Sequence, residues 1–230
     1  MLPNDIITAV ESYKNHSGPT DRYTSFDYCY NYFRETDDLE LDIEKSCLTL
    51  GYYLASWGMF RGSSFLLQKS LKHFQTTICY INKLDQSFWD IDVNNYEPSS
   101  IKTIIGIYSE LKNHFIPSGK MDLTLVTKIL LGVFGFIPAF DNNFCNAFRE
   151  ICNHQCGFRK LNSKSLFQIK SFYETNKEVI DQLSSTTFTT DFKTGQKTKI
   201  NYTRAKIIDM YGFITGSEAR SMMGKHVFIS

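Results

Sequence analysis

The sequence lacks any hydrophobic run long enough to cross a lipid bilayer. Its longest apolar stretch, Ile129–Phe140, holds two glycines and a proline and is bounded by Lys128 and Asp141, whereas a membrane helix needs about 20 apolar residues. The first residues, MLPNDIITAVESYKN, lack the basic start and the apolar core of a signal peptide. Because these signals are missing, we expect a cytoplasmic protein without membrane contact, whose six cysteines are reduced thiols.

Several widespread catalytic patterns are also missing. The sequence has no phosphate-binding glycine loop, no Ser/His/Asp order typical of hydrolases and no H-E-x-x-H metal motif. It has no internal repeat and no linker rich in proline, glycine and serine that would mark a domain boundary. We therefore expect one continuous domain over residues 1–230.

Apolar residues at helical spacing occupy most of the chain. Residues 41–60, for example, carry an apolar face behind an acidic first turn, as the helix dipole prefers. The pattern predicts helices at 3–16, 41–60, 64–83, 101–115, 123–136, 142–152, 163–183 and 203–213. The threonine-rich residues 185–202 alternate in polarity, which predicts a short β-hairpin or an ordered loop. The expected fold class is mainly α. We expect a single all-α domain, and two helical lobes with a cleft between them are one arrangement that the pattern allows.

Charge is spread unevenly although the net charge is only +1. Residues 1–50 hold ten acidic and four basic side chains, whereas residues 158–206 hold ten basic and four acidic ones. Such asymmetry is typical of a protein with one face that accepts a polyanion, and solvated helix faces produce it equally well.

The most informative segment is a helical hairpin that ends in a carboxylate. Residues 117–120, Pro-Ser-Gly-Lys, predict a tight turn, and the apolar helix that follows is stopped by Pro138. Asp141 comes just beyond this stop, before Asn142. It is placed either to cap the next helix or to carry out chemistry at the mouth of the hairpin.

Residues 116–144, IPSGKMDLTLVTKILLGVFGFIPAFDNNF, resemble the core of the helix-hairpin-helix DNA glycosylase superfamily. In that family a glycine-containing hairpin is followed by an apolar helix, a proline-containing turn and an aspartate. Gly119 stands at the hairpin position and Asp141 at the aspartate position. The stretches YLASWGMFRGSSFLL (53–67) and YTRAKIIDMYGFI (202–214) resemble an uncharacterised bacterial family that shares a P-x-x-D turn.

The resemblance implies a multi-helix glycosylase-type fold and an enzyme that excises a modified or damaged base from double-stranded DNA. The target nucleotide is flipped out of the stack. Asp141 then stabilises the oxocarbenium ion electrostatically and positions water. Anti-phage enzymes that remove modified cytosines are one conceivable branch, and no cofactor is required.

The resemblance also suggests which residues contact the nucleic acid. The hairpin residues Ser118, Gly119 and Lys120 would hold a phosphate, and Lys128 and Arg61 would hold the flanking backbone. Candidates for lining the base pocket are the aromatic and acidic side chains Trp57, Asp27, Tyr28 and Tyr30.

Two departures from the family pattern bear on the mechanism. Only Gly119 stands clearly in a hairpin position, and neither Lys120 nor Lys128 matches the lysine nucleophile of the bifunctional members. These departures favour a monofunctional enzyme without lyase chemistry. Trp57 and Arg61, four residues apart, would stack on one helix, either as a ligand clamp or as a packing anchor.

Two further patterns offer alternatives. Cys145, Cys152 and Cys156, with His154 among them, could form a metal site, but on a helix the cysteines share one face and fit buried core thiols. Arg149 and His154 make the R-x4-H pattern of HEPN-type ribonucleases. A non-catalytic helical DNA-binding or accessory protein is the remaining alternative to the glycosylase.

Overall fold

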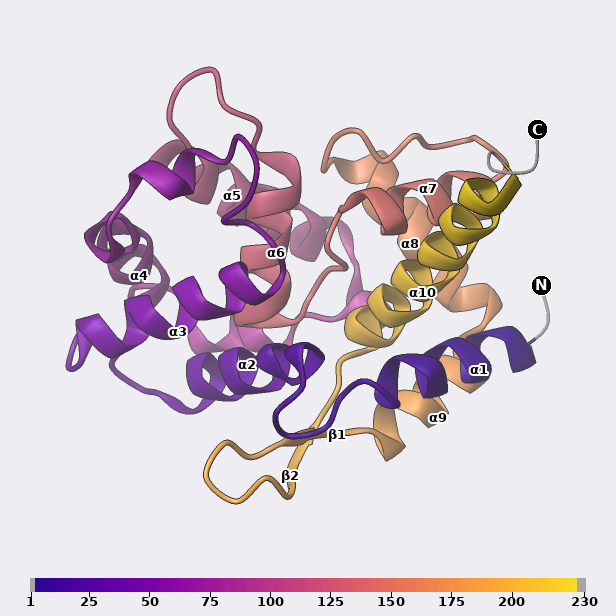
Figure 1. Ribbon diagram of the computed structural model, residues 1–230, viewed down its shortest axis with the longest axis horizontal. Helices are drawn as coiled ribbons and strands as arrows, with labels where there is room; N and C mark the ends of the chain where they lie inside the picture. The colour runs from indigo at the N-terminus through magenta and orange to yellow at the C-terminus, as the bar shows by residue number, and fades with distance from the viewer. Residues whose placement is uncertain (1–2, 227–230) are drawn as a thin grey trace.

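The computed structural model describes residues 3–226, which form a mainly α protein with one two-stranded hairpin (Figure 1). The elements, in chain order, are α1 (Pro3–Lys14), η1 (Arg22–Thr24), α2 (Ser25–Glu35), α3 (Ile43–Ser56), η2 (Phe65–Gln68), η3 (Leu71–Phe74), α4 (Gln75–Asn82), η4 (Gln86–Asp90), η5 (Val93–Asn95), α5 (Pro98–Phe115), α6 (Leu123–Phe134), α7 (Asn142–Ile151), α8 (Ser163–Thr175), α9 (Lys177–Thr186), β1 (Phe188–Thr190), β2 (Lys197–Asn201) and α10 (Arg204–His226). The expected fold class is confirmed.

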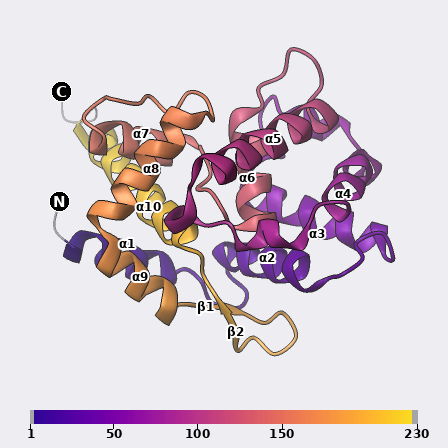
Figure 2. The same ribbon diagram turned by 180° about the vertical axis from the view of Figure 1, so that it is seen from behind.

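The helices form two groups that face each other (Figures 1 and 2). In the first lobe, α2 packs on α6 and α3, while α4 and α5 complete the group. In the second lobe, α10 packs on α7, α1 and α9, and α8 contacts α9. The chain enters the second lobe through α1, builds the whole first lobe, and returns along the segment between α6 and α7. That return segment therefore lies at the junction of the lobes.

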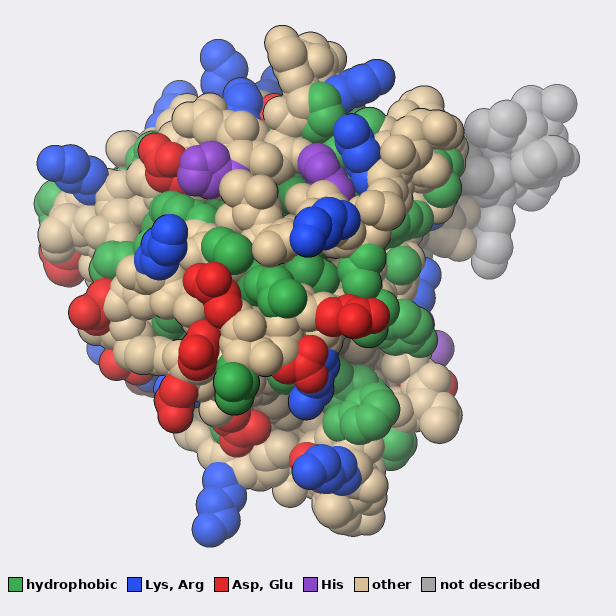
Figure 3. Space-filling view, turned by 90° about the vertical axis from the view of Figure 1, so that its left-hand side faces the viewer, with side chains coloured by type: hydrophobic (Ala, Val, Ile, Leu, Met, Phe, Trp, Pro, Cys, Tyr) green, Lys and Arg blue, Asp and Glu red, His purple; other side chains and the backbone are tan. Residues whose placement is uncertain are grey.

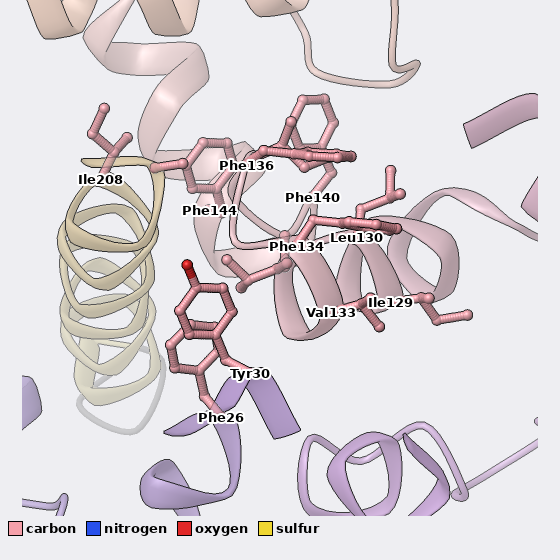
Figure 4. Close-up of a cluster of buried hydrophobic side chains, with 14 of the residues drawn as sticks. Phe26, Tyr30, Ile129, Leu130, Val133, Phe134, Phe136, Phe140, Phe144 and Ile208 are labelled. Atoms are coloured by element: carbon pink, nitrogen blue, oxygen red, sulfur yellow. The ribbon is translucent and has the colours of Figure 1, made fainter. Parts of the chain in front are cut away.

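One continuous apolar core joins the two lobes. Phe134 and Phe136 stack with ring centroids 4.8 Å apart, and Phe140 and Phe144 stack at 5.6 Å. Figure 4 shows these rings between α6 and α10, close to Tyr30 of α2. Aromatic side chains bury large areas and dominate core energetics, so the return segment is fixed by its own phenylalanines.

The backbones of α7 and α10 approach each other unusually closely. A Cβ atom at Gly216 would lie 2.1 Å from the carbonyl oxygen of Asn143, and one at Gly212 would lie 2.6 Å from the Phe144 ring. Only glycine permits such contact, because any side chain would collide with a backbone or ring atom. The two glycines, one helical turn apart, therefore set the position of α7 against α10.

The β-hairpin is tied to the first lobe by the buried carboxylate of Asp27, which accepts the backbone N–H of Thr190. Strands β1 and β2 pair antiparallel, with Phe188 opposite Asn201 and an irregularity before Thr190. The threonine-rich segment is thus a hairpin, the first of the two structures that its sequence allowed.

Two predicted helices are interrupted in the structure. Residues 64–83 form η2, η3 and α4 instead of one helix, because residues 67–70 are all exposed and break the apolar stripe that a continuous helix would bury. Residues 163–183 divide into α8 and α9 at Asn176, whose backbone angles (φ −120°, ψ 25°) leave the helical region. The last helix extends further than expected, to His226.

Within residues 3–226, no helix is both long and apolar enough to span a membrane. Figure 3 views the end of the molecule that carries α3 and α4. Acidic side chains gather in the lower part of this face, while most lysines and arginines lie toward its upper edge. The turn between α5 and α6 projects at that same upper edge in Figure 1.

Candidate functional site between the two helical lobes

Asp141 is held at the start of α7 by contacts on both sides. It is the N-cap of this helix, and its Oδ1 accepts a hydrogen bond of 3.0 Å from the backbone N–H of Phe144. The residue before it, Phe140, donates its N–H to Thr127 and accepts from the Thr124 hydroxyl, both at 2.9 Å. These contacts bind the return segment to the first turns of α6. Asp141 therefore lies near the end of α6 that carries the hairpin turn.

The second oxygen of Asp141 faces a buried lysine. Lys128 Nζ lies 3.1 Å from Asp141 Oδ2, and the two side chains are 4% and 17% exposed. Burying an ammonium group costs several kcal/mol unless it is paired with an opposite charge, so Asp141 is the counter-charge of Lys128 as well as a helix cap. Oδ1 is committed to the backbone N–H of Phe144, whereas Oδ2 contacts only the Lys128 ammonium group within the described part of the chain.

A second buried ion pair lies beside the same tryptophan. Lys128 Nζ is 4.9 Å from the ring centroid of Trp57, and Lys206 Nζ is 5.5 Å from it. Lys206 contacts Asp209 Oδ2 at 2.8 Å, and Asp209 Oδ1 accepts the N–H of Ala139 at 3.0 Å. The second pair therefore also holds the return segment, two residues before Asp141.

A small pocket lies between these groups, with walls from both lobes. Its volume is about 10 Å³, which is room for roughly one water molecule and not for a base or a sugar. The indole nitrogen of Trp57 is buried and has no hydrogen-bond partner among the described residues. The lining residues are Tyr53, Trp57, Lys128 and Leu131 from the first lobe, and Asp141, Asp209 and Phe213 from the second.

Two buried tyrosines complete the surroundings of the ion pairs. Lys206 Nζ donates to the Tyr13 hydroxyl at 3.0 Å. Burial, reinforced by the nearby charge of Asp209, raises the pKa of Tyr13 well above its usual value. Burial likewise raises the pKa of Tyr53. Both phenols therefore remain protonated and act as neutral hydrogen-bonding groups.

The hairpin turn has the conformation that its sequence predicts. Gly119 adopts φ +75°, and the N–H of Lys120 donates to the Pro117 carbonyl at 3.1 Å. Ser118, Gly119 and Lys120 are all exposed. Their backbone and side chains are available to a ligand that approaches this end of α6.

Lys128 and Arg61 are placed differently from what the sequence suggested. Lys128 is buried against Asp141, so it is not available to a phosphate on the surface. Helix α3 ends at Ser56, and Gly58 follows with φ +73°. The expected helical stacking of Arg61 on Trp57 is therefore wrong, because the two residues do not share a helix. Arg61 is exposed and packs against Gly58 instead.

Asp27 holds the β-hairpin in place through hydrogen bonds and does not line the small pocket. It is fully buried, with Oδ1 accepting from the Tyr202 hydroxyl and Oδ2 from the N–H of Thr190 at 2.8 Å. Burial raises the pKa of Asp27. These bonds fasten β1 and the segment before α10 to α2, which gives Asp27 a complete structural role.

Tyr28 and Tyr30 also lie apart from the pocket. The Tyr28 hydroxyl donates to the Pro19 carbonyl at 2.6 Å, and its ring meets the edge of Phe192. Tyr30 borders a separate open groove of about 420 Å³ beside the start of α10. Of the four residues proposed for a base pocket, the structure brings only Trp57 to Asp141.

Two charged groups of the open groove, Asp92 and Arg204, are paired with each other. Asp92 accepts the N–H groups of Arg204 and Ala205, which caps α10, and lies 3.5 Å from the Arg204 guanidinium. Burial raises the pKa of Asp92. These contacts give Asp92 and Arg204 a role as supports of α10.

The cysteines of α7 and the following loop are core groups. Cys152 and Cys156 are buried, and Cys145 Sγ contacts the Phe158 carbonyl. Burial first, and the charge of Asp141 second, raise the pKa of Cys145 to about 12. Among residues 3–226, no group of three or more His, Cys, Asp or Glu side chains is arranged to hold a metal ion.

Arg149 and His154 meet at a shared carboxylate on the surface. Glu150 lies 3.5 Å from Arg149 Nε and 3.1 Å from His154 Nε2. His154 is exposed and adopts φ +60°, just beyond the end of α7. The Glu150 carboxylate therefore lies between the two side chains and pairs with both.

Several residues of the site were not singled out from the sequence. Tyr13, Tyr23 and Phe213 come from three separate segments and meet at Trp57. Their convergence depends on how the lobes pack, which no local pattern reports. Lys206 carried a usable signal, because a lysine three residues before Asp209 in an otherwise apolar helix start favours a buried pair.

The fold and the site together define a mainly α protein with a carboxylate–lysine pocket at the junction of two helical lobes. Comparison with protein-family models, curated proteins and solved structures finds no match for this chain. The chemistry of the pocket is therefore inferred from its own residues.

Proposed function

We propose that the protein is a DNA glycosylase-like enzyme that removes a modified or damaged base, with Asp141 as its central carboxylate. The observation that carries the proposal is the position of Asp141: between two lobes, beside a buried lysine and a tryptophan, near the end of α6 that bears the exposed Gly119 turn. A charged cluster of this kind within a pocket is typical of functional sites. The resemblance of residues 116–144 to the glycosylase superfamily agrees with this arrangement.

The residues provide the chemistry that base excision requires. Cleavage of the N-glycosidic bond leaves positive charge on the sugar, and a fixed carboxylate stabilises it most strongly where water is largely excluded. Asp141 Oδ2 has this role, since Oδ1 is committed to the helix cap. The pocket has room for roughly one water molecule beside it, and a water held there would attack the sugar while Asp141 orients it.

The outer surface supports binding of the duplex. The exposed turn offers the backbone N–H groups of Ser118 and Gly119 and the ammonium group of Lys120 to a phosphate, while the Lys120 N–H closes the turn. The lower part of the face in Figure 3 is acidic and would repel DNA. We therefore expect the duplex to lie across the end of the molecule where the turn projects, with the target nucleotide extruded toward Asp141.

The test is incubation of the protein with genomic DNA from bacteria and from phages with modified bases, followed by chemical detection of abasic sites. Asp141→Asn keeps a capping side chain, because asparagine caps helices as well as aspartate, but removes the carboxylate. We expect abasic sites with the wild type and loss of about 10²–10³ in rate with this variant.

A matched control is Asp42→Asn. Asp42 caps α3 through the N–H of Lys45 at 3.0 Å, the same hydrogen bond to the third following residue as at Asp141 but away from the pocket. This variant should retain full activity. Full activity in Asp141→Asn would remove Asp141 from the mechanism. DNA binding without abasic sites in the wild type would favour the non-catalytic accessory protein.

A second candidate activity follows from the 3.1 Å contact between Lys128 Nζ and Asp141. If the amine, after giving a proton to Asp141, attacks the sugar C1′, a C–N bond forms as the base leaves with the electron pair of the glycosidic bond. The bound nitrogen then loses a proton, and its lone pair forms a C1′=N bond as the C1′–O4′ bond breaks and O4′ takes up the proton. Borohydride reduces the resulting protonated imine to a stable protein–DNA adduct. An adduct that Lys128→Met abolishes would establish lyase chemistry, whereas excision without an adduct supports the monofunctional enzyme.

A further inference from the structure

An aromatic ring from another part of the chain stacks on Trp57, which lines the pocket at Asp141. Tyr23, in the short turn η1, stacks on Trp57 with centroids 5.4 Å apart and planes at 14°, and on Tyr13 at 4.4 Å and 26°. Tyr23 is partly exposed, whereas Tyr13 and Trp57 are 1% and 9% exposed. Tyr23 is thus the outer member of this aromatic group.

The three rings form two layers: Tyr13 and Trp57 make up one layer, and Tyr23 makes up the other. Tyr13 and Trp57 are 6.4 Å apart with planes at 12°. The outer rings of a three-layer stack would be separated by about 7 Å or more, since each layer is at least about 3.5 Å thick. Tyr13 and Trp57 therefore lie side by side, and Tyr23 lies across both. Phe213 meets all three rings edge-on and closes one side.

Tyr23 is held mainly by this stacking. Its hydroxyl makes no hydrogen bond to any residue in the range 3–226, and η1 is a single turn without a side-chain cap. The neighbouring Arg22 is exposed, and its guanidinium lies 5.1 Å from the Tyr23 centroid and 5.5 Å from that of Trp57. The Tyr23 ring and the Arg22 guanidinium thus both lie beside Trp57.

We propose that the place filled by Tyr23 is a binding site for a flat aromatic heterocycle, and that the base of an extruded nucleotide displaces the Tyr23 ring from Trp57 and Tyr13. The identity of the ligand as a nucleotide rests on the proposed function. Exchange of one stacked ring for another keeps the aromatic contact, and Arg22 is close enough to meet the phosphate. Displacement of Tyr23 also frees one contact of Trp57, a wall of the pocket that is otherwise too small for a substrate.

The two tryptophans of the chain provide a direct readout. In ¹⁵N-labelled protein, the indole N–H of Trp57 reports on the site. The indole of Trp89 donates to the Val133 carbonyl at 2.9 Å, so its signal serves as an internal reference. Thymidine and deoxyguanosine 5′-monophosphate are titrated into the wild type and into Tyr23→Ala, Tyr23→Phe and Tyr28→Ala.

We expect the nucleotides to shift the Trp57 signal and leave that of Trp89 in place. Tyr23→Ala should bind about tenfold more tightly than the wild type, because the competing closed state is removed. Tyr23→Phe keeps the ring and should match the wild type. Tyr28 is a partly exposed tyrosine on α2 that stacks elsewhere, so Tyr28→Ala should also match it.

The proposal is overturned if Tyr23→Ala binds no more tightly than the wild type, or if the Trp57 signal does not move. If the alanine variant does not fold, Tyr23→Leu fills the space without a flat face and should show the same tighter binding. Excision is measured separately. Nucleotide binding that depends on Tyr23, in a protein that forms no abasic sites, would uphold this site and refute the proposed function. Excision that is independent of Tyr23 would do the reverse.

Discussion

The two buried lysines beside Trp57 differ in what surrounds them. Lys206 is 1% exposed, and its partner Asp209, three residues away on the same helix, is 9% exposed and uses its other oxygen to bind Ala139. Lys128 is also buried, but its partner Asp141 belongs to a different element and is 17% exposed. Both pairs reach the pocket, the first through Asp209 only, but the first is almost fully enclosed and supports the return segment, whereas the second has a partly exposed carboxylate. Lys206 and Asp209 thus have a structural role, whereas Lys128 is paired with a carboxylate, Asp141, that a ligand can reach.

The largest effect is expected from removal of the enclosed lysine. Lys206→Met leaves the Asp209 carboxylate buried without its counter-charge, which should lower the free energy of unfolding by about 3–5 kcal/mol. Lys128→Met leaves a carboxylate that is partly exposed and still caps α7, so a smaller loss of about 1–3 kcal/mol is expected. Urea denaturation of both variants measures the difference. Equal losses would contradict the distinction, and adding Asp209→Asn to Lys206→Met should recover part of the stability.

The next prediction separates the two carboxylates by activity. Asp141→Asn should reduce base excision about 10²–10³-fold. Asp209→Asn keeps an oxygen that accepts the Ala139 N–H and should affect excision much less than folding stability. Single-turnover excision rates, measured at temperatures where both variants remain folded, test this ordering. Should Asp209→Asn be the more damaging of the two for the rate, the assignment of roles is reversed.

A third prediction compares the buried Lys128 with the exposed Lys120. Lys120→Gln should weaken DNA binding about equally for all sequences and lower the slope of log affinity against log salt by about 1, because one phosphate contact is lost. Lys128→Gln should leave this slope unchanged, since a buried ammonium group releases no counterions. Fluorescence anisotropy at several salt concentrations measures both slopes. A reduced slope in Lys128→Gln would mean that the lysine reaches the surface when DNA binds.

The smallest effect concerns the field of Asp141 at a neighbouring thiol. Burial and then the Asp141 charge hold the pKa of Cys145 near 12, so Asp141→Asn should lower this pKa and modestly increase the thiolate fraction at pH 8.5. Alkylation of Cys145 by iodoacetamide, followed by peptide mass spectrometry, should therefore become faster. Asp209→Asn is the control and should leave the rate unchanged. The change is small because burial remains the main cause of the raised pKa.

Local features of the chain could be predicted from its sequence with good accuracy. The helix predicted over residues 123–136 ends at Phe134. Gly135, and not Pro138 as expected, ends it, because Gly135 adopts φ 71° and its N–H bonds to the carbonyls of Leu130 and Leu131. Asp141 caps the following helix, as the Asp-Asn-Asn sequence indicates. Such signals act over a few residues, so they are readable without knowledge of the packing. The break at residues 67–70 was missed because it depends on which faces the rest of the molecule covers.

The site itself was predictable only in part. Asp141 and Trp57 were both singled out, but they lie 84 positions apart in the sequence, and only the packing of the lobes brings them to one pocket. Asp27 shows the opposite case: an acidic residue among tyrosines suggests a ligand site, yet it binds Tyr202 and Thr190, which are far away in the chain. Residues that are distant in the sequence decide whether both oxygens of a carboxylate are hydrogen-bonded or one remains accessible to a ligand.

The glycine contacts between α7 and α10 have a mechanical consequence. Because Gly216 lies against the Asn143 carbonyl, α7 and α10 have no room to slide or tilt, and we expect them to move as one rigid unit. Asp141 and Asp209 then keep a constant separation. A bulky substrate must therefore enter by movement of residues outside this unit. The short turn η1, which bears Tyr23 and lacks a side-chain cap, lies outside this unit, and we expect it to be the part that moves.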